Sequence, residues 1–394
     1  MSILDRVKKL MNKKQLILTA EDQKVMSHEV SEFIKNAGMK SKTVAVLEPH
    51  PWHGEVYPAF IKYFLDLGYD VHLLVDAQHT GLNSLVNCNF PSDRFKMFEF
   101  AHFPIKQEFY DFLVNYEYLF LMTVLTHDGF HYALSLERNF LQKYNKNNLY
   151  CISHELSSLN NRTETFESRM VDKNRVFVLR DKIKYKEKEL PFVSPVYFGD
   201  IKITSKNKKT KFISIGGVWK KGLRNFDNLF NTMKKLHENN IRNFEIIFVG
   251  VDKVSLEAYI TPEIQPYITL IGRVPYNQLF NCVEDADFIL FNSDPTTKDF
   301  DKYMHYGITG NYMHTLAFQT PGLIYEELGN EYLLDNTRAI HYTNDLYDAM
   351  KKAIEISPEQ YEQMQNNLGE LKETLMAESF KNMKQAFGEV LVKC

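Results

Sequence analysis

The feature that most constrains the fold is a strand, loop, helix, strand pattern near the start of the chain. Residues 43–49, TVAVLEP, form a short apolar run, and a loop with proline and glycine follows. Residues 56–68, VYPAFIKYFLDLG, have helical spacing and close on Gly68, where a helix C-terminal cap belongs. The run YDVHLLVD at 69–76 predicts the next strand. Because such a βαβ unit crosses over right-handed, the sequence predicts a parallel sheet.

The same architecture repeats in the second half of the chain. Further strands of the first half are expected at 95–100, 118–124, 149–153 and 175–180. The pattern restarts with a strand at 211–215 and an amphipathic helix that Asn225 can cap. A chain of 394 residues also exceeds what one hydrophobic core usually supports. We therefore expect an α/β protein with two Rossmann-like, doubly wound domains facing a cleft, where the ligands of such sheets bind.

Composition and periodicity also suggest where the domains begin and end. The polar, lysine-rich stretch DIKITSKNKKTK has lost the apolar rhythm and is the best candidate for a linker. Near the C-terminus, SPEQ has the pattern of a helix start with a capping box. The expected segments are a helical lead (1–41), a first Rossmann-like domain (42–198), a linker (199–210), a second Rossmann-like domain (211–370) and a C-terminal helix returning to the first domain (371–394).

The composition excludes several classes of protein. Hydrophobic residues make up 44% and charged residues 25% of the chain, which argues against a disordered and against a fibrous protein. The formal net charge of −3 gives no reason to expect a nucleic acid partner. Four cysteines are scattered without paired spacing, which favours a reducing compartment over a disulfide framework or a zinc site. With no signal-peptide pattern and no long apolar run, we expect a cytoplasmic protein.

Residues 1–14, MSILDRVKKLMNKK, have the pattern of a basic amphipathic helix. Apolar residues recur at helical spacing, and five lysines and arginines stand against Asp5 alone. The helix either packs on its own domain with a solvated lysine face or makes a peripheral contact with the inner face of a membrane.

In the stretch FISIGGVWKKG at 212–222, two glycines directly follow a predicted strand, and two lysines come shortly after them. Gly216 and Gly217 leave room for a ligand to approach the backbone, and Lys220 and Lys221 offer charge to phosphate oxygens. The following helix would add its N-terminal dipole. The alternative is a tight turn between strand and helix, with the lysines on a solvated rim.

A second loop makes the phosphate hypothesis more specific. The run ITLIGRVPYNQLFNCVEDADFILFNSD resembles the nucleotide-binding domain of GT-B glycosyltransferases, in particular the family 4-like group. The elements that carry the resemblance are Gly272, Arg273, Val274, Pro275, Ala286 and Asp287. It implies that Gly216, Lys221 and Gly222 bind the diphosphate of a nucleotide-sugar donor together with Arg273, and that Val274 and Pro275 contact the nucleoside. An arginine usually follows the first glycine in this group, and here Gly217 stands there.

A third segment departs from the family pattern. The family has two glutamates that hold the donor sugar and the ribose, and the matching positions carry Tyr306 and His314. What remains is a predicted helix start at Thr309, Gly310 and Asn311, which offers backbone N–H groups to an anion. By position, His314 and Thr315 would contact the ribose and Tyr306 the sugar. Alternatively, Tyr306 and His314 only fill a packed loop.

In the first domain the loop PHPWHGEVYPAF matches the segment that approaches the acceptor in GT-B proteins. Gly54 is the expected close-approach position, with His53 beside it, and Glu55 is a candidate general base if the enzyme inverts configuration. The strand at 149–153 runs into His154, at a position where the family has a histidine facing the donor sugar. Asp128 is a further carboxylate at a strand end. A metal site is not expected, because a third ligand is lacking.

The resemblance implies a glycosyltransferase of the hexosyltransferase type, acting in polysaccharide or glycoconjugate biosynthesis. It would transfer a sugar from a nucleotide-diphosphate sugar to a glycan, a lipid-linked saccharide or a protein, with no cofactor and without a metal ion, because lysines and backbone N–H groups would stabilise the leaving diphosphate. The missing glutamates leave open a non-catalytic GT-B subunit of a glycosyltransferase complex, and a GT-B sugar-nucleotide epimerase is a further alternative. A nicotinamide enzyme is disfavoured, because no G-x-G-x-x-G follows the first strand.

Overall fold

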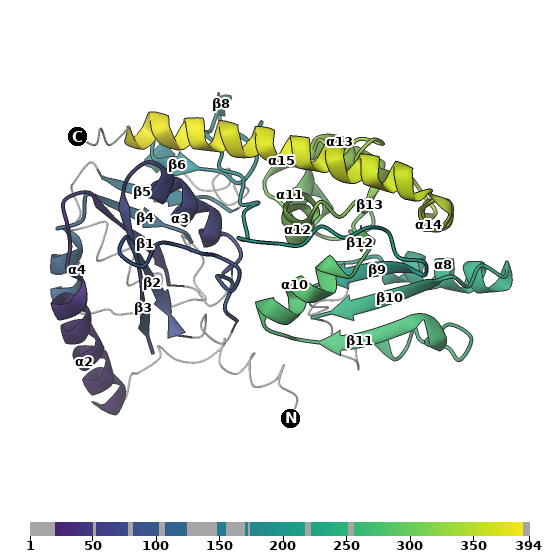
Figure 1. Cartoon of the computed structure of the whole chain (residues 1–394), viewed down its shortest axis with the longest axis horizontal. Coiled ribbons are helices and arrows are strands. Elements are labelled where there is room, and N and C mark those ends of the chain that lie inside the picture. Colours follow the sequence, from purple (N-terminus) through teal and green to yellow (C-terminus); the bar gives the residue numbers. More distant parts are fainter. Residues whose placement is uncertain are drawn as a thin grey trace. The chain divides into compact units, whose positions relative to one another are not determined.

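The protein divides into two compact units in its computed structural model (Figure 1). The structure describes residues 20–49, 53–77, 82–101, 107–123, 148–154, 170–171, 174–216, 222–250 and 256–388. The first unit comprises Met1–Gly81, Phe90–Pro191 and Met383–Cys394, and the second comprises Leu82–Asn89 and Phe192–Asn382. The expected basic helix at 1–14 lies outside the described residues.

A six-stranded sheet in the order β3-β2-β1-β4-β5-β6 forms the centre of the first unit, and every strand pair in it is parallel. Its strands are β1 (Thr43–Glu48), β2 (Asp70–Asp76), β3 (Phe95–Phe100), β4 (Tyr118–Leu121), β5 (Leu149–Ile152) and β6 (Val176–Phe177). The helices are α2 (Ala20–Asn36), α3 (Tyr57–Asp66) and α4 (Gln107–Leu113), and β7 (Lys184–Tyr185) pairs antiparallel with β8 (Lys188–Glu189). The strand order reverses between β1 and β4, which confirms the prediction of a doubly wound parallel sheet.

Aromatic packing on one face of this sheet explains why α3 docks there. Apolar residues recur along α3, so that Phe60 and Phe64 are fully buried. Their ring centroids lie 5.0 and 5.6 Å from that of Phe120 on β4. Phe387 joins the same cluster, 4.9 Å from Phe64, and its carbonyl accepts a hydrogen bond of 2.8 Å from the Tyr69 hydroxyl. The C-terminal end of the chain's last helix is thereby part of the first unit's core.

The second unit repeats the pattern with a parallel sheet in the order β11-β10-β9-β12-β13-β14. Its strands are β9 (Thr210–Ile215), β10 (Phe244–Val249), β11 (Ile268–Gly272), β12 (Phe288–Leu290), β13 (Gly322–Tyr325) and β14 (Ala339–Tyr342). Its helices are α8 (Phe226–Glu238), α10 (Tyr276–Glu284), α11 (Phe300–His305), α12 (Gly310–Phe318), α13 (Glu326–Glu331), α14 (Leu346–Glu355) and α15 (Pro358–Phe387), with a 3-10 turn at Gln265–Tyr267. The strand order reverses between β9 and β12, so this edge is where ligands of such sheets bind.

The stretch expected to be a linker lies inside the second unit. The Asp287 carboxylate accepts hydrogen bonds of 2.7 Å from the backbone N–H groups of Asn207 and Lys211. The Thr204 hydroxyl donates to the Glu284 carbonyl at 2.6 Å. Burial raises the pKa of Asp287, and the hydrogen bonds that it accepts oppose this effect. The polar side chains of the stretch therefore mark a hydrogen-bonded coil.

A short segment between β2 and β3 also belongs to the second unit. In Leu82–Asn89, the Leu82 carbonyl accepts a hydrogen bond of 2.8 Å from the Tyr276 N–H, and the Asn87 carbonyl accepts one of 2.8 Å from the Asp200 N–H. Gly199 has a φ of +80°, and a Cβ there would lie 1.9 Å from the Asn87 carbonyl oxygen. Only glycine fits at this position, because the two backbones touch.

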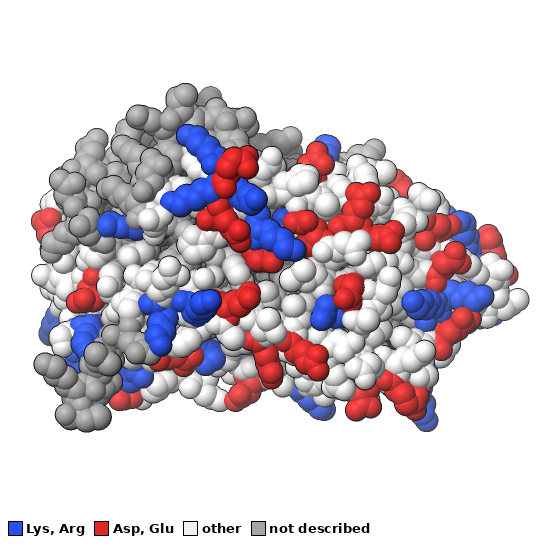
Figure 2. Space-filling model, turned by 90° about the horizontal axis from the view of Figure 1, so that it is seen from above, with Lys and Arg blue, Asp and Glu red and all other residues white. Residues whose placement is uncertain are grey.

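On the face in Figure 2, lysine and arginine side chains are intermixed with aspartate and glutamate side chains. Among the described helices none has the length and apolar content that crossing a bilayer would require.

Candidate functional site

Three glycines line the carboxyl edge of the second sheet. Two of them directly follow β9 and β10, and the third is the last residue of β11. Gly216, Gly250 and Gly272 have φ values of +109°, +85° and +74°, a conformation that residues with a side chain rarely adopt. Gly216 N–H donates to the Val249 carbonyl at 2.9 Å, and Gly250 N–H donates to the Gly272 carbonyl at 2.6 Å. The row presents backbone without side chains beside the point where the strand order reverses.

Arg224 bridges the two strands at that point. Its guanidinium donates to the Ile215 carbonyl at the end of β9, at 2.6 Å, and to the Phe291 carbonyl just after β12, at 3.0 Å. A Cβ on Gly216 would lie 2.7 Å from Arg224 Nη2, so the guanidinium sits directly against that glycine. The chain holds it there because the next residue, Asn225, caps α8 and donates its backbone N–H to the Asn292 carbonyl at 2.9 Å.

The charge of Arg224 has no carboxylate partner within 4.0 Å in the described parts of the chain. Its two hydrogen bonds go to neutral carbonyls, and burial of the guanidinium lowers its pKa, an effect that Tyr303 opposes. Arginine stays charged even so. Arg224 is half-buried by its exposed surface. A partly desolvated cation that no described carboxylate neutralises favours the binding of an anion beside it.

Polar side chains after β12 complete this edge. Asn225 Nδ2 donates to the Asp294 carboxylate at 2.6 Å, and Asn292 Nδ2 donates to the Ser214 hydroxyl at 3.1 Å. Asn292, Ser293 and Asp294 are all buried. These bonds tie the loop after β12 to the start of α8 and to β9.

The N-terminus of α12 lies where the sequence predicted it. Thr309 is the N-cap, and its hydroxyl accepts a hydrogen bond of 3.2 Å from the Tyr312 N–H. Asn311 Nδ2 donates to the Leu290 carbonyl at 2.9 Å, which ties the helix start to the end of β12. A Cβ added to the exposed Gly310 would meet nothing within 4 Å. The first turn of α12 therefore offers N–H groups at the same edge as the glycine row.

His314 and Thr315 face inward from α12. His314 is 3% exposed and stacks on Phe198 with ring centroids 5.4 Å apart, and Thr315 is fully buried. This conformation does not offer either side chain to a ribose, and it favours the alternative that His314 fills a packed core. Tyr306 is half-buried and is the C-cap residue directly after α11.

The remaining residues of the predicted donor site fall into two groups. Arg273 is exposed directly after Gly272, and Val274 and Pro275 are half-buried before α10, whose N-cap is Pro275. Gly217, Lys220 and Lys221 lie outside the described residues, as does Asp128 of the first unit.

In the first unit the structure brings together three of the predicted site residues, His53, Glu55 and His154, at the carboxyl edge. The rings of His53 and His154 lie 4.5 Å apart between centroids at an angle of 32°. His53 Nδ1 lies 3.9 Å from the Glu55 carboxylate. His53 has a φ of +67°, a strained conformation for a residue with a side chain, and the adjacent Gly54 is buried. Two imidazoles and a carboxylate form an acid–base cluster.

Sequence reasoning missed the residues that support this cluster. Glu48 ends β1 and is fully buried, and its carboxylate accepts a hydrogen bond of 2.7 Å from the Thr123 hydroxyl. His154 Nε2 donates to the Met122 carbonyl at 2.6 Å. A glutamate directly after the apolar run 44–47 was the available signal.

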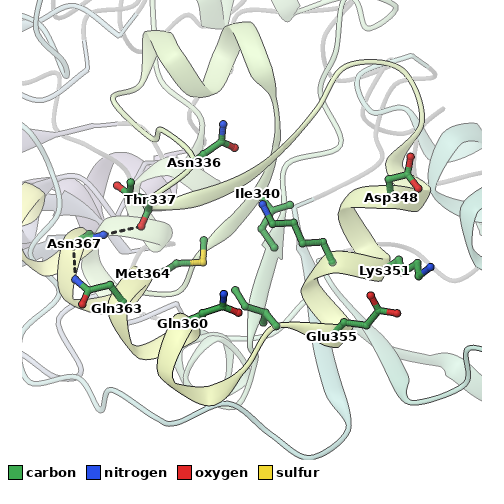
Figure 3. A pocket seen from close by; sticks show the side chains of 12 residues that line it. Asn336, Thr337, Ile340, Asp348, Lys351, Glu355, Gln360, Gln363, Met364 and Asn367 are labelled. Carbon is green, nitrogen blue, oxygen red and sulfur yellow. Dashed lines mark hydrogen bonds between the residues drawn. The ribbon is translucent and has the colours of Figure 1, made fainter.

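The cavity in Figure 3 lies at the other edge of the second sheet. It has a volume of about 690 Å³ and is lined by Thr337 and Ile340 near the start of β14, by Lys351 and Glu355 of α14, and by Met364 of α15. Because Ile340 is near the amino end of a parallel strand, this cavity is remote from the glycine row. We do not assign it to the candidate site.

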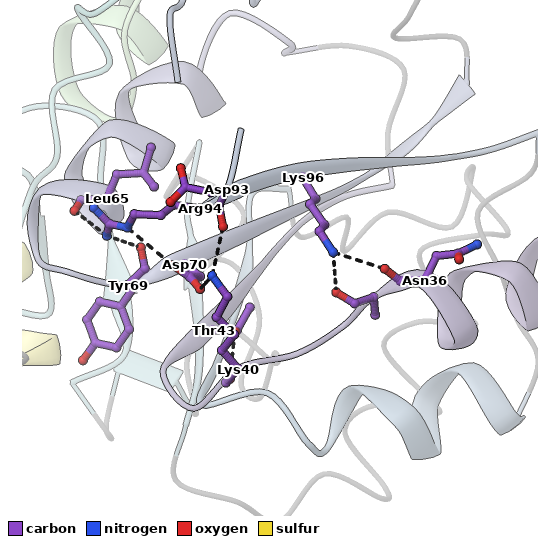
Figure 4. A network of polar contacts seen from close by, with 10 residues as sticks. Asn36, Lys40, Thr43, Leu65, Tyr69, Asp70, Asp93, Arg94 and Lys96 are labelled. Atoms are coloured by element: carbon purple, nitrogen blue, oxygen red, sulfur yellow. Dashed lines mark hydrogen bonds and ion pairs between the residues drawn. The ribbon is translucent and has the colours of Figure 1, made fainter. Parts of the chain in front are cut away.

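A charged network in the first unit is likewise structural (Figure 4). Arg94 Nη2 donates to the carbonyls of Leu65 and Tyr69 at 2.9 and 2.7 Å, and Lys40 Nζ lies 3.1 Å from the Asp70 carboxylate. These contacts join the end of α3 to the starts of β2 and β3. Within the described residues no group of three histidine, cysteine, aspartate or glutamate side chains could hold a metal ion.

The sequence matches no family model and no curated protein. Among solved structures, the chain is similar to an α-glucosyltransferase in complex with UDP and a 13-mer DNA (12% identity, TM-score 0.52, covering 88% of this chain and 96% of that one). It is similar to sucrose-phosphate synthase from Thermosynechococcus elongatus (10% identity, TM-score 0.52, covering 90% of this chain and 100% of that one). It is also similar to a Listeria monocytogenes protein named as a UDP-N-acetylglucosamine 2-epimerase (10% identity, TM-score 0.53, covering 83% of this chain and 91% of that one).

Proposed function

We propose that the protein is a glycosyltransferase that binds the diphosphate of a nucleotide-sugar donor at the carboxyl edge of its second unit. Its two doubly wound units have the fold of GT-B glycosyltransferases. The observation that carries the proposal is the guanidinium of Arg224 against Gly216, which no carboxylate in the described part of the chain neutralises. It lies at the same edge as the bare backbone of Gly250 and the first turn of α12. A diphosphate would find a cation, N–H groups and no obstructing side chain there.

The transfer reaction assigns roles to this edge. The anomeric carbon forms a bond to an acceptor hydroxyl oxygen while its bond to the diphosphate oxygen breaks, and the electron pair leaves with the diphosphate. Arg224 and the N–H groups of α12 would stabilise the charge that develops on the leaving group. We propose that no metal ion is required, because fixed protein charge performs this task. Arg273, directly after Gly272, would add charge at the same edge. Lys221 stays a predicted diphosphate contact outside the described residues.

The first unit would supply the acid–base chemistry. In an inverting transfer the acceptor hydroxyl proton goes to a carboxylate, and Glu55 is the candidate base beside His53 and His154. The acceptor would be a glycan, a lipid-linked saccharide or a protein.

An epimerase is the second candidate. One solved structure with this fold is named as a UDP-N-acetylglucosamine 2-epimerase, and the His53–Glu55–His154 cluster has the acid and base groups that such chemistry needs. An epimerase would change the sugar of a nucleotide sugar without any acceptor.

Thermal denaturation with a panel of nucleoside diphosphates, followed by turnover of the matching nucleotide sugars, tests the proposal. A nucleoside diphosphate that binds only the folded chain raises its melting temperature by mass action. Free nucleoside diphosphate released slowly without an acceptor would support a transferase, and recovery of an altered sugar would support the epimerase. Binding without turnover would support a non-catalytic GT-B subunit. No stabilisation by any nucleotide would contradict the proposed site.

A further inference from the structure

Glu48 is a buried carboxylate at the carboxyl end of β1, beside the point where the strand order of the first unit reverses. It is fully buried, and so is the rest of β1. Burying a carboxyl group is costly unless hydrogen bonds satisfy it. A glutamate contributes little apolar surface to a core, so the contacts of its carboxylate are the feature to explain.

The carboxylate of Glu48 holds the chain just beyond β4. The Thr123 hydroxyl donates to Glu48 Oε2 at 2.7 Å, and the Met122 N–H donates to the Leu47 carbonyl at 2.9 Å. Two successive residues after β4 are thereby attached to two successive residues of β1. The pairing of these strands is extended by one side-chain hydrogen bond.

The Met122 carbonyl, fixed by these bonds, receives His154. His154 Nε2 lies 2.6 Å from the Met122 carbonyl oxygen. Because a carbonyl only accepts, Nε2 must carry a hydrogen, and this bond therefore selects one tautomer of the neutral ring. The same ring packs against His53, with centroids 4.5 Å apart.

We infer that Glu48 is a positioning residue: through Thr123 it places the Met122 carbonyl, which holds the ring and the Nε2–H tautomer of His154. It acts through other residues, so it is not catalytic itself. The positioning stands independently of the proposed function. Its effect on turnover rests on the proposed sugar transfer.

Substitutions at Thr123 and Glu48 separate the hydrogen bond from the charge. Thr123→Val removes the hydroxyl and keeps the shape, whereas Thr123→Ser keeps the hydroxyl. Glu48→Gln removes the charge but keeps an oxygen that accepts from Thr123. If the hydrogen bond between Thr123 and Glu48 positions His154, Thr123→Ser and Glu48→Gln should keep the wild-type tautomer of His154, whereas Thr123→Val should not. Thr123→Ala replaces the valine variant should that variant fail to fold.

The first readout is the ring 15N NMR spectrum of the full chain labelled at histidine, with the His154 signals assigned by their loss in His154→Gln. We expect the Nε2–H form in the wild type, Thr123→Ser and Glu48→Gln, and a mixture of tautomers in Thr123→Val. Wild-type His154 signals in a folded Thr123→Val chain would overturn the inference.

The second readout is turnover of the nucleotide sugar that the thermal screen identifies. For Thr123→Val we expect kcat to fall about tenfold, because small displacements of a reacting group are costly. KM for the donor should stay within about twofold, because the proposed diphosphate contacts lie in the second unit. A rise in KM alone would count against positioning. If the wild type turns over no nucleotide sugar, the proposed function fails, while the ring spectra still decide the inference.

Discussion

The guanidinium of Arg224 fills the space that a side chain at Gly216 would need, with 2.7 Å between Arg224 Nη2 and the position of a Cβ there. The same guanidinium joins the ends of β9 and β12. Gly216 and Arg224 therefore depend on each other. The guanidinium can lie against this strand end only because residue 216 has no side chain.

Arg224→Gln should weaken nucleoside diphosphate binding. The variant removes the charge and at least one of the two hydrogen bonds to carbonyls, and charge-assisted bonds contribute about 1.5–3 kcal/mol. We expect a loss of affinity of about tenfold or more by calorimetry. Arg338→Gln is the matched control, because Arg338 pairs with Asp335 and lies outside the candidate site. If Arg224→Gln and Arg338→Gln bind the nucleoside diphosphate with equal affinity, Arg224 is not part of the donor site.

Thr309→Ala tests the first turn of α12. Loss of an N-cap side chain costs about 1 kcal/mol of stability, since one backbone N–H loses its partner. Ser357→Ala removes the cap of α15, where the Ser357 hydroxyl accepts from the Gln360 N–H at 3.2 Å. Both variants should lower the melting temperature by a similar amount. Only Thr309→Ala should also weaken nucleoside diphosphate binding. If the two variants bind the nucleoside diphosphate equally well, the first turn of α12 does not contact the ligand.

The sequence predicted the doubly wound sheets well because their signal is local. The alternation of apolar runs with helical spacing and Gly68 lie within short windows, and the parallel order follows from right-handed crossovers. Glycines and a capped helix at strand ends also pointed to one edge of the second sheet.

The supporting contacts of the site were not predictable in this way. Arg224 follows two lysines in a loop and looks like part of a solvated rim, but its partner carbonyl at Phe291 is 67 residues away. Glu48 and Thr123 are 75 residues apart. The stretch 199–210 looked like a linker because its composition is polar, whereas the N–H of Asn207 in it binds the distant Asp287. Long-range hydrogen bonds leave no periodicity in the sequence.

His72 should make the stability of the first unit depend on pH. It is buried on β2, and its Nδ1 lies 2.7 Å from the Tyr116 hydroxyl. Burial, together with Lys96 and Lys40 and opposed by Asp70, lowers its pKa to about 4. In the unfolded chain the pKa is about 6.5. The unfolded state therefore binds a proton first as pH falls, so stability is fully present above about pH 6.5 and is lost toward pH 4.

Denaturant unfolding at several pH values measures this effect in His72→Gln, which removes the titration. Between pH 6.5 and 4 the free energy of unfolding of this variant should fall less steeply with pH than that of the wild type. The difference between the two slopes corresponds to at most about one bound proton. His305→Gln, at an exposed histidine, is the control and should follow the wild type. Identical slopes in all three chains would show that His72 titrates normally.

Gly199→Ala should destabilise the second unit more than an ordinary substitution of a glycine with positive φ. A Cβ at Gly199 would lie 1.9 Å from the Asn87 carbonyl oxygen, and neither backbone can yield without breaking the Asp200–Asn87 hydrogen bond of 2.8 Å. Gly388→Ala is the matched control: its φ is +73°, and a Cβ there would meet nothing within 4 Å. The control should lose about 1 kcal/mol from backbone strain alone. For Gly199→Ala we expect a loss of about 3 kcal/mol or more, since strain and a backbone clash add. Chemical denaturation compares the two chains, and equal losses would mean that the Leu82–Asn89 segment is not packed against Gly199.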